Sequence, residues 1–171
     1  MSKNVVVIPL DGSDDGIRIL AVVQKLLSPE KNRLILLRVC QDSQGLVGPS
    51  MSHSAIGSDV AIYATQQDVV RSKHPIYATQ MQESQRAEVF FELKDTLNSL
   101  ESLGYEATLE VTFGEPAEQI INFVTLTNVD LVAMITHGRS GLGKMIFGNV
   151  AEELMHKADV PVLLLRAAPR H

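Results

Sequence analysis

The sequence has no tryptophan, one cysteine, three tyrosines and five phenylalanines among its 171 residues. The single thiol, Cys40, cannot form an internal disulfide, so the chain requires no oxidising compartment. Cys40 ends the mostly apolar run 34–40, and we interpret it as a small buried hydrophobic residue rather than a reactive thiol. The histidines show no metal-ligand spacing with Cys40 or with one another, and we therefore predict no structural metal.

Positive charge is also scarce. The 15 lysines and arginines are outnumbered by 20 acidic residues, which gives a formal net charge of −5. Non-specific nucleic-acid binding depends on an excess of lysine and arginine, so we expect no nucleic-acid partner. No apolar run is long enough to span a bilayer, and the N-terminus lacks a cleavage pattern, so we expect a cytoplasmic protein without a membrane partner.

What the sequence does contain is typical of one globular domain over residues 1–171, with 45% hydrophobic and 20% charged residues. Short apolar runs, several of them rich in β-branched residues, alternate with segments of helical period. Continuous apolar runs favour strands covered on both faces. We predict strands at 5–9, 33–40, 107–113, 130–135 and 160–165.

The helices are predicted from their caps and apolar stripes. Ser13 is expected to cap a first helix that ends near Pro29. A second helix begins at about residue 83 and carries the stripe Phe90, Leu93, Leu97 and Leu100. Two more helices are expected, one from Pro116 and one over residues 149–157.

Regular alternation of strands and helices predicts an α/β fold, with one doubly wound, five-stranded parallel sheet and helices on both faces. Such sheets bind ligands beyond the carboxyl ends of the strands, where the winding reverses. If the strand order is 3-2-1-4-5, the reversal lies between the first and fourth strands and would bring Asp11, after the first strand, beside Gly138, after the fourth.

Residues from about 41 to 82 interrupt this alternation. The stretch is rich in Ser, Gln, Gly and Met, and the pentapeptide Ile62–Gln66 recurs as Ile76–Gln80. We interpret it as a local duplication within a long, irregular insertion into the single domain, mobile or partly helical. A role in binding a partner is the alternative.

The loop over residues 136–149 is the strongest local signal for a ligand. Its glycines let the backbone approach a ligand closely, and Arg139 adds positive charge. Gly148 and Asn149 stand at a predicted helix start, where free N–H groups favour a phosphate. The alternative is that the glycines only turn the chain.

Several motifs, taken in order, resemble the universal stress protein family. They are VVIPLDGS at residues 6–13, GEPA at 114–117, HGRSG at 137–141, GNVAE at 148–152 and VPVLLL at 160–165. The resemblance covers nearly the whole chain except residues 41–82. It implies an adenine-nucleotide α-hydrolase-like fold with strand order 3-2-1-4-5, usually as a homodimer, in which some members bind ATP.

The resemblance also implies a set of binding residues. Asp11 matches the acidic residue that contacts ribose, and Val39 matches the position whose backbone meets adenine. The phosphate contacts would come from the glycine-rich loop and the helix that follows it. The nucleotide-binding residues expected in this sequence are Asp11, Val39, Gly138, Arg139, Gly141, Gly148 and Asn149.

Two positions depart from the pattern of ATP-binding members, which is Gly, two residues, Gly, nine residues, Gly, then Ser or Thr. Ile135 replaces the first glycine, where its branched side chain would crowd a nucleotide. Asn149 replaces the final Ser or Thr and still offers a backbone N–H and a polar side chain.

These observations support three hypotheses. The first is a stress-response dimer that binds ATP, with Mg²⁺ entering only with the nucleotide, and that hydrolyses ATP weakly if at all. The dimer would form through the edge strand Val160–Leu165. The second is a stress protein that binds no nucleotide and acts through protein partners. The third is an adenylate-forming enzyme of the wider α/β class, with a second substrate pocket built from residues 41–82.

Overall fold

The computed structural model describes residues 2–41, 75–136, 140–141, 144–145 and 148–167. The strands are β1 (Asn4–Leu10), β2 (Asn32–Cys40), β3 (Glu106–Phe113), β4 (Leu131–Thr136), β5 (Ser140–Gly141), β6 (Lys144–Met145) and β7 (Val162–Arg166). The helices are α1 (Asp14–Leu26), α3 (Pro75–Ser102), α4 (Pro116–Thr127) and α5 (Asn149–Lys157).

The main sheet has five strands in the order β3-β2-β1-β4-β7, and every pairing in it is parallel. This arrangement confirms the predicted α/β fold. It also confirms the order 3-2-1-4-5, in which β7 is the fifth strand of the main sheet. The winding reverses between β1 and β4, which pair through Val6 with Leu131 and Val7 with Val132. The loops that leave these two strands therefore start from the same edge of the sheet. A separate antiparallel pair, β5 with β6, lies within the glycine-rich loop.

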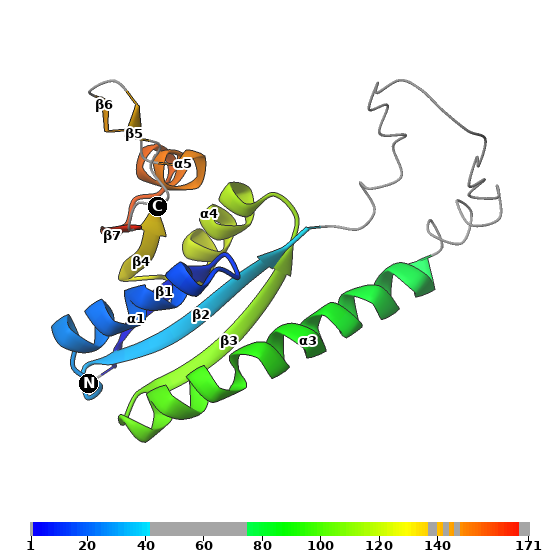
Figure 1. The fold of residues 1–171 in the computed structure, drawn as a ribbon, viewed down its shortest axis with the longest axis horizontal. Coiled ribbons are helices and arrows are strands. Elements are labelled where there is room, and N and C mark those ends of the chain that lie inside the picture. Colours follow the sequence, from blue (N-terminus) through cyan, green and yellow to red (C-terminus); the bar gives the residue numbers. More distant parts are fainter. Residues whose placement is uncertain (1, 42–74, 137–139, 142–143, 146–147, 168–171) are drawn as a thin grey trace.

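Helices cover both faces of the sheet, and the buried side chains form two cores. The core under α1 and α3 contains Leu34 and Leu36 of β2, and the core under α4 and α5 contains Ile35 and Leu37. Side chains alternate across a strand, so the continuous apolar run of β2 serves both cores. Figure 1 shows α1 and α3 on one side of the sheet and α4 and α5 on the other.

Local signals set most of the helix ends. The Ser13 side chain caps α1 by accepting a hydrogen bond from the Gly16 N–H at 3.1 Å. Pro116 begins α4 in the first turn, where its missing N–H costs nothing. Gly104 follows α3 with φ +89°, a conformation that glycine adopts without strain. The roles of Ser13 and Pro116 agree with the sequence-based predictions.

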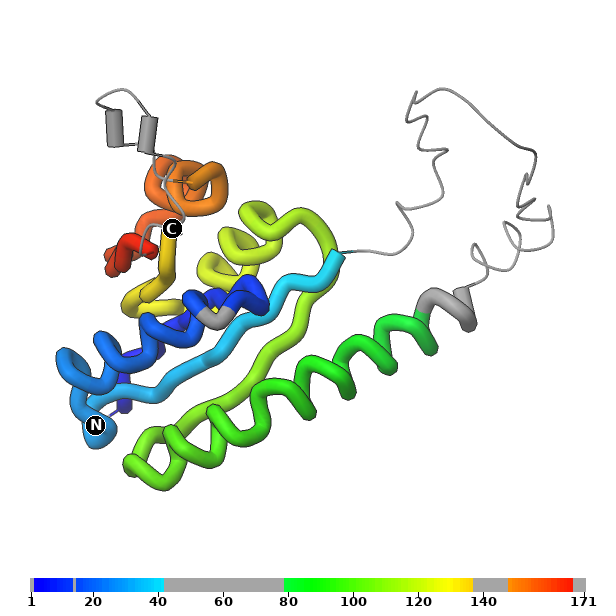
Figure 2. The backbone as a smooth tube through the Cα atoms, in the orientation of Figure 1, coloured from blue at the N-terminus to red at the C-terminus, as the bar shows by residue number. Residues whose placement is uncertain are grey.

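Two expectations for α3 are wrong. Phe90 lies on the exposed side of the helix with 54% of its surface accessible, and Val89 is buried in its place. Spacings of three and of four residues both fit a helical stripe. The predicted stripe used Phe90, three residues before Leu93, whereas the buried residue is Val89, four residues before it. Residues 75–82, assigned above to the irregular insertion, form the first turns of α3, which runs along β3 in Figure 2. The second copy of the repeat, residues 76–80, is thus helical, while the first copy lies outside the described residues.

Candidate functional site

The turn after β1 holds an exposed carboxylate in a defined position. Oδ1 of Asp11 accepts hydrogen bonds from the Ser13 N–H at 3.0 Å and from the Ser13 hydroxyl at 2.6 Å. The same hydroxyl oxygen accepts from the Gly16 N–H at the start of α1. The helix cap and the position of the carboxylate are therefore linked through one side chain.

Gly16 is part of this arrangement because it leaves room for the carboxylate. A Cβ atom at residue 16 would lie 2.8 Å from Oδ1 of Asp11, closer than such atoms approach in proteins. Glycine is otherwise unfavourable inside a helix by about 1 kcal/mol relative to alanine. Its presence in the first turn of α1 lets the Asp11 carboxylate lie against the helix.

The second half of the candidate site is the start of α5, which follows the glycine-rich loop. Gly148 is the N-cap residue, and no side chain caps the start of this helix. The Gly148 N–H donates to Oγ1 of Thr136, the last residue of β4, at 3.1 Å. This bond ties the start of α5 to the end of β4. The N–H groups of the first helical turn, beginning with Asn149, lack intrahelical acceptors and carry the positive end of the helix dipole, which favours an anion.

The strand order places part of the predicted site after the carboxyl ends of two neighbouring strands. Asp11 follows β1 and Gly148 with Asn149 begins the helix after β4, and these two strands are neighbours in the sheet. Val39 is the penultimate residue of strand β2, where it is half-buried against the α4/α5 core and pairs with Thr112 of β3.

The remaining predicted residues lie in the glycine-rich loop. Gly141 ends the short strand β5, for which only the backbone is described. Gly138 and Arg139 lie outside the described residues. Ile135, the residue that departs from the ATP-binding pattern, is partly buried and packs against the α1/α3 core.

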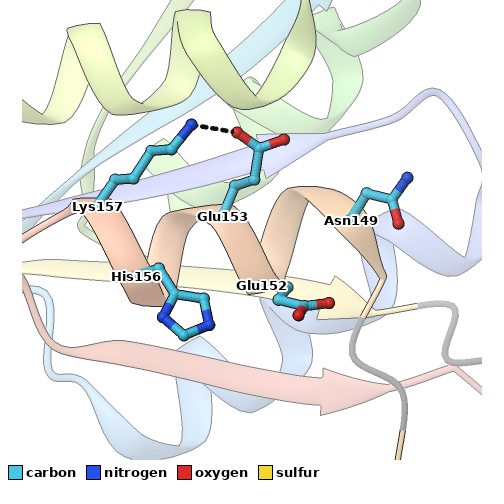
Figure 3. Close-up of a pocket in the computed structure, with 5 residues that line it drawn as sticks. All are labelled: Asn149, Glu152, Glu153, His156 and Lys157. Carbon is cyan, nitrogen blue, oxygen red and sulfur yellow. Dashed lines mark hydrogen bonds and ion pairs between the residues drawn. The ribbon is translucent and has the colours of Figure 1, made fainter.

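A shallow pocket of about 270 Å³ lies along α5 and is drawn in Figure 3. Its lining residues all come from this helix: Asn149, Glu152, Glu153, His156 and Lys157. Nζ of Lys157 lies 2.7 Å from a carboxylate oxygen of Glu153, which neutralises one acidic group. Glu152 adds a further carboxylate, and no lining residue comes from β1 or β2. This acidic lining is unsuited to phosphate, and the pocket shares only Asn149 with the predicted nucleotide-binding residues.

The thiol of Cys40 lies at the carboxyl end of β2, close to the same edge of the sheet. It is free, and it is half-buried rather than fully buried as expected. Burial raises the pKa of the Cys40 thiol above its ordinary value, although the nearby cations Arg38 and Arg86 act in the opposite direction. A raised pKa leaves little thiolate at neutral pH, which is consistent with a structural thiol.

Two polar residues of this edge were missed from the sequence. Thr136 supplies the acceptor for Gly148, and Arg38 is a buried cation, with 7% of its surface accessible, next to the turn after β1. Arg38 had a detectable signal, because a charged residue stood in an otherwise apolar strand. Thr136 had none, since threonine is common at the end of a strand.

Comparison with known proteins identifies the family. Residues 1–166 match the model of the universal stress protein family. The chain belongs to the universal stress protein family. This result confirms the resemblance carried by the motifs at both ends of the sequence.

Curated relatives agree with this assignment. The chain is 32% identical over 84 residues to the stress response protein NhaX of Bacillus subtilis, covering 49% of each chain. It is 34% identical over 74 residues to the universal stress protein MJ0531 of Methanocaldococcus jannaschii, covering 43% of this chain and 44% of the relative. The matched part thus spans about half the length of these relatives.

Solved structures share the fold of this family member. The hypothetical protein MJ0577 superposes with a TM-score of 0.69 at 18% identity, over 99% of this chain and all of that one (100%). A family protein from Arabidopsis thaliana with AMP bound has a TM-score of 0.56 at 17% identity, covering 96% of this chain and 92% of the other. A universal stress protein in complex with cAMP has a TM-score of 0.60 at 13% identity, covering 98% and 100%.

Two searches of the structure bear on metals and membranes. Among the described residues, no three or more His, Cys, Asp or Glu side chains are grouped so that they could hold a metal ion. Within the same residues, no helix combines the length and the apolar character that crossing a bilayer requires.

Proposed function

We propose that this universal stress protein is a cytoplasmic stress-response module that binds an adenine nucleotide, ATP with Mg²⁺ in particular, and hydrolyses it slowly if at all. The observation that carries the proposal is the pairing of β1 with β4, which directs the Asp11 turn and the start of α5 to one edge of the sheet. A ribose hydroxyl needs an acceptor, which the Asp11 carboxylate offers. A phosphate needs donors, which the backbone amides at the start of α5 offer.

The phosphate contacts in this proposal come from the backbone. The amides of the first turn of α5 lack intrahelical acceptors, and a phosphate bound there would interact with the helix dipole. Replacement of a Ser or Thr hydroxyl by Asn149 leaves these amides in place. Gly138, Arg139 and Gly141 would complete the cradle, and the Val39 backbone would meet adenine. The structures of family proteins with AMP and with cAMP support an adenine nucleotide as the ligand.

Calorimetric titration with ATP, ADP and AMP, with and without Mg²⁺, tests the proposal. Asp11→Asn keeps the size of the side chain and removes its charge, and we expect it to weaken nucleotide binding about tenfold. Asp15→Asn is the matched control, because Asp15 pairs with Arg18 on the surface of α1, at 3.2 Å, and has no place in the site. Absence of a binding signal from a folded wild-type sample would refute the proposal.

A second candidate is a family member that binds no nucleotide and works through protein partners. The packing of Ile135 in β4 favours it, because a branched side chain stands where ATP-binding members have glycine. If this position limits binding, Ile135→Gly with Asn149→Ser should strengthen ATP binding, and an unchanged affinity would contradict that account. Release of pyrophosphate with an added substrate would instead support the adenylate-forming hypothesis.

The free edge of β7 supports a homodimer as part of the proposal. β7 is the last strand of the sheet and pairs only with β4 in the part of the chain that the structure describes. Residues 162–165 are apolar and only half-buried. Pairing with the same strand of a second copy would satisfy both edges through one self-complementary contact.

A further inference from the structure

Arg38 occupies a position where the sheet otherwise buries leucine. Leu34 and Leu36 of β2 are fully buried in the α1/α3 core, and the alternation of the strand places Arg38 next on the same face. Only 9% of its side-chain surface is accessible. A buried cation is unfavourable unless it is paired, so its contacts should explain its presence.

The guanidinium group of Arg38 lies between helix α3 and the turn that follows β1. Its Nη2 donates to Oε1 of Glu92 on α3, in an ion pair whose carboxylate is half-exposed. Its Nη1 fills the space beside Gly12, where a Cβ atom would lie 2.2 Å from this nitrogen. Gly12 has φ +81°, so both its conformation and its lack of a side chain fit this approach. Arg38 therefore packs against the turn that follows β1 from the side of α3.

This turn is the one that carries the candidate ribose contact. Asp11 precedes Gly12, and its Oδ1 accepts the two hydrogen bonds from Ser13. Leu10, the last residue of β1, is the direct neighbour of Arg38 in the sheet. A side chain that fixes Gly12 therefore limits the directions in which the Asp11 carboxylate can point.

We propose that Arg38 is a positioning residue: held by Glu92, its guanidinium fixes the Gly12 backbone and thereby orients Asp11 toward the ribose of a bound nucleotide. This inference rests on the proposed nucleotide-binding function. An aliphatic side chain would fill the same volume without desolvating a charge, and the ion pair with Glu92 accounts for an arginine here.

The test compares ATP with 2′,3′-dideoxy-ATP, which lacks the hydroxyl groups that Asp11 would bind. We expect Arg38→Met to weaken ATP binding about tenfold, as when one hydrogen bond to a charged group is lost, and to leave dideoxy-ATP binding unchanged. The preference for ATP over dideoxy-ATP should therefore fall, as we also expect for Asp11→Asn. Arg18→Met, which removes an exposed arginine from α1, should keep the wild-type preference.

A milder variant keeps the test valid if Arg38→Met fails to fold. Glu92 is half-exposed, so Glu92→Gln leaves the core intact and removes only the charge that holds the guanidinium. We expect the same selective loss for ATP, smaller in size. An equal loss for both nucleotides, or no loss for either, would overturn the inference and leave Arg38 as a stabilising residue only.

A second measurement separates this inference from the proposed function. Amide exchange at Ser13 and Gly16, measured by NMR without nucleotide, reports how firmly the turn is held, and in Arg38→Met both amides should exchange about tenfold faster. If the wild type binds no nucleotide, the proposed function fails and the exchange rates still test the hold on the turn. Unchanged rates would overturn the inference whatever the wild type binds.

Discussion

Substitution of Gly12 by alanine should destabilise the protein more than any other glycine-to-alanine change near the site. The left-handed conformation at φ +81° costs a residue with a Cβ about 1–2 kcal/mol. The new methyl group would also lie 2.2 Å from Nη1 of Arg38 and would force the guanidinium away from Glu92. Loss of a fully buried ion pair costs about 3–5 kcal/mol, and the half exposure of Glu92 reduces that figure. We expect a total loss of about 2–4 kcal/mol in the free energy of unfolding.

Gly148→Ala is the matched control for this prediction. Gly148 has φ −55°, which suits any residue, and a Cβ atom there would lie 3.8 Å from Oγ1 of Thr136, an ordinary contact. Alanine is a weaker N-cap residue than glycine, so a loss of about 0.5 kcal/mol is expected.

Urea denaturation followed by circular dichroism measures both variants on the same scale. The midpoint should fall clearly for Gly12→Ala and only slightly for Gly148→Ala, with the dependence on urea unchanged. Equal midpoints for the two variants would refute the reasoning, because they would show that Arg38 yields to a side chain at residue 12 without loss. Such a result would also weaken the proposed hold of Arg38 on the turn.

Three further predictions concern Tyr105, Thr136 and Val162. Burial raises the pKa of Tyr105, whose hydroxyl donates to the Leu27 carbonyl, so the stability it contributes is complete below its unfolded pKa, near pH 10, and is lost as the pH rises through the higher folded value. Tyr105→Phe should therefore remove this alkaline loss in thermal melts, and persistence of the loss would contradict the assignment. Thr136→Val should lower stability by about 1 kcal/mol and speed amide exchange at Gly148, whose N–H loses its acceptor; an unchanged exchange rate would show that the bond contributes nothing. For the proposed homodimer through β7, Val162→Glu should reduce the mass measured by sedimentation from dimer to monomer, because the twofold contact would bring two like charges together; a dimer of unchanged stability would place the interface elsewhere.

The strands and helix caps were predictable because their signals are local. A short apolar run indicates a buried strand wherever it occurs, and Ser13 or Pro116 marks a helix start through contacts within a few residues. The order of the strands is a long-range property, and it came from the resemblance to a family rather than from the pattern. Asp11 was singled out by the resemblance to the family, and Gly148 by the resemblance and by its place at a predicted helix start.

What the sequence could not provide depends on contacts between distant residues. Arg38 and Glu92 are separated by 54 positions, and nothing local connects them. Phe90 was assigned to the core because the apolar stripe fitted it as well as Val89, and only the angle at which α3 meets the sheet separates the two. The first turns of α3 contain several polar residues, and the first turn has no acidic residue to mark a helix start. The sequence therefore carried no clear signal that these residues are helical.

The two halves of the candidate site share a mode of support, and in the proposed function this support bears on the departure at Asn149. Each half is held by the side chain of a neighbouring strand end: Arg38 of β2 lies against the turn after β1, and Thr136 of β4 holds the start of α5. The donors offered to a phosphate are backbone amides, whose directions depend on these supports and not on the side chain at residue 149. Substitutions at the supports should therefore affect nucleotide binding more than Asn149→Ser does. The opposite ranking would mean that the side chain at residue 149, rather than the backbone, sets the affinity.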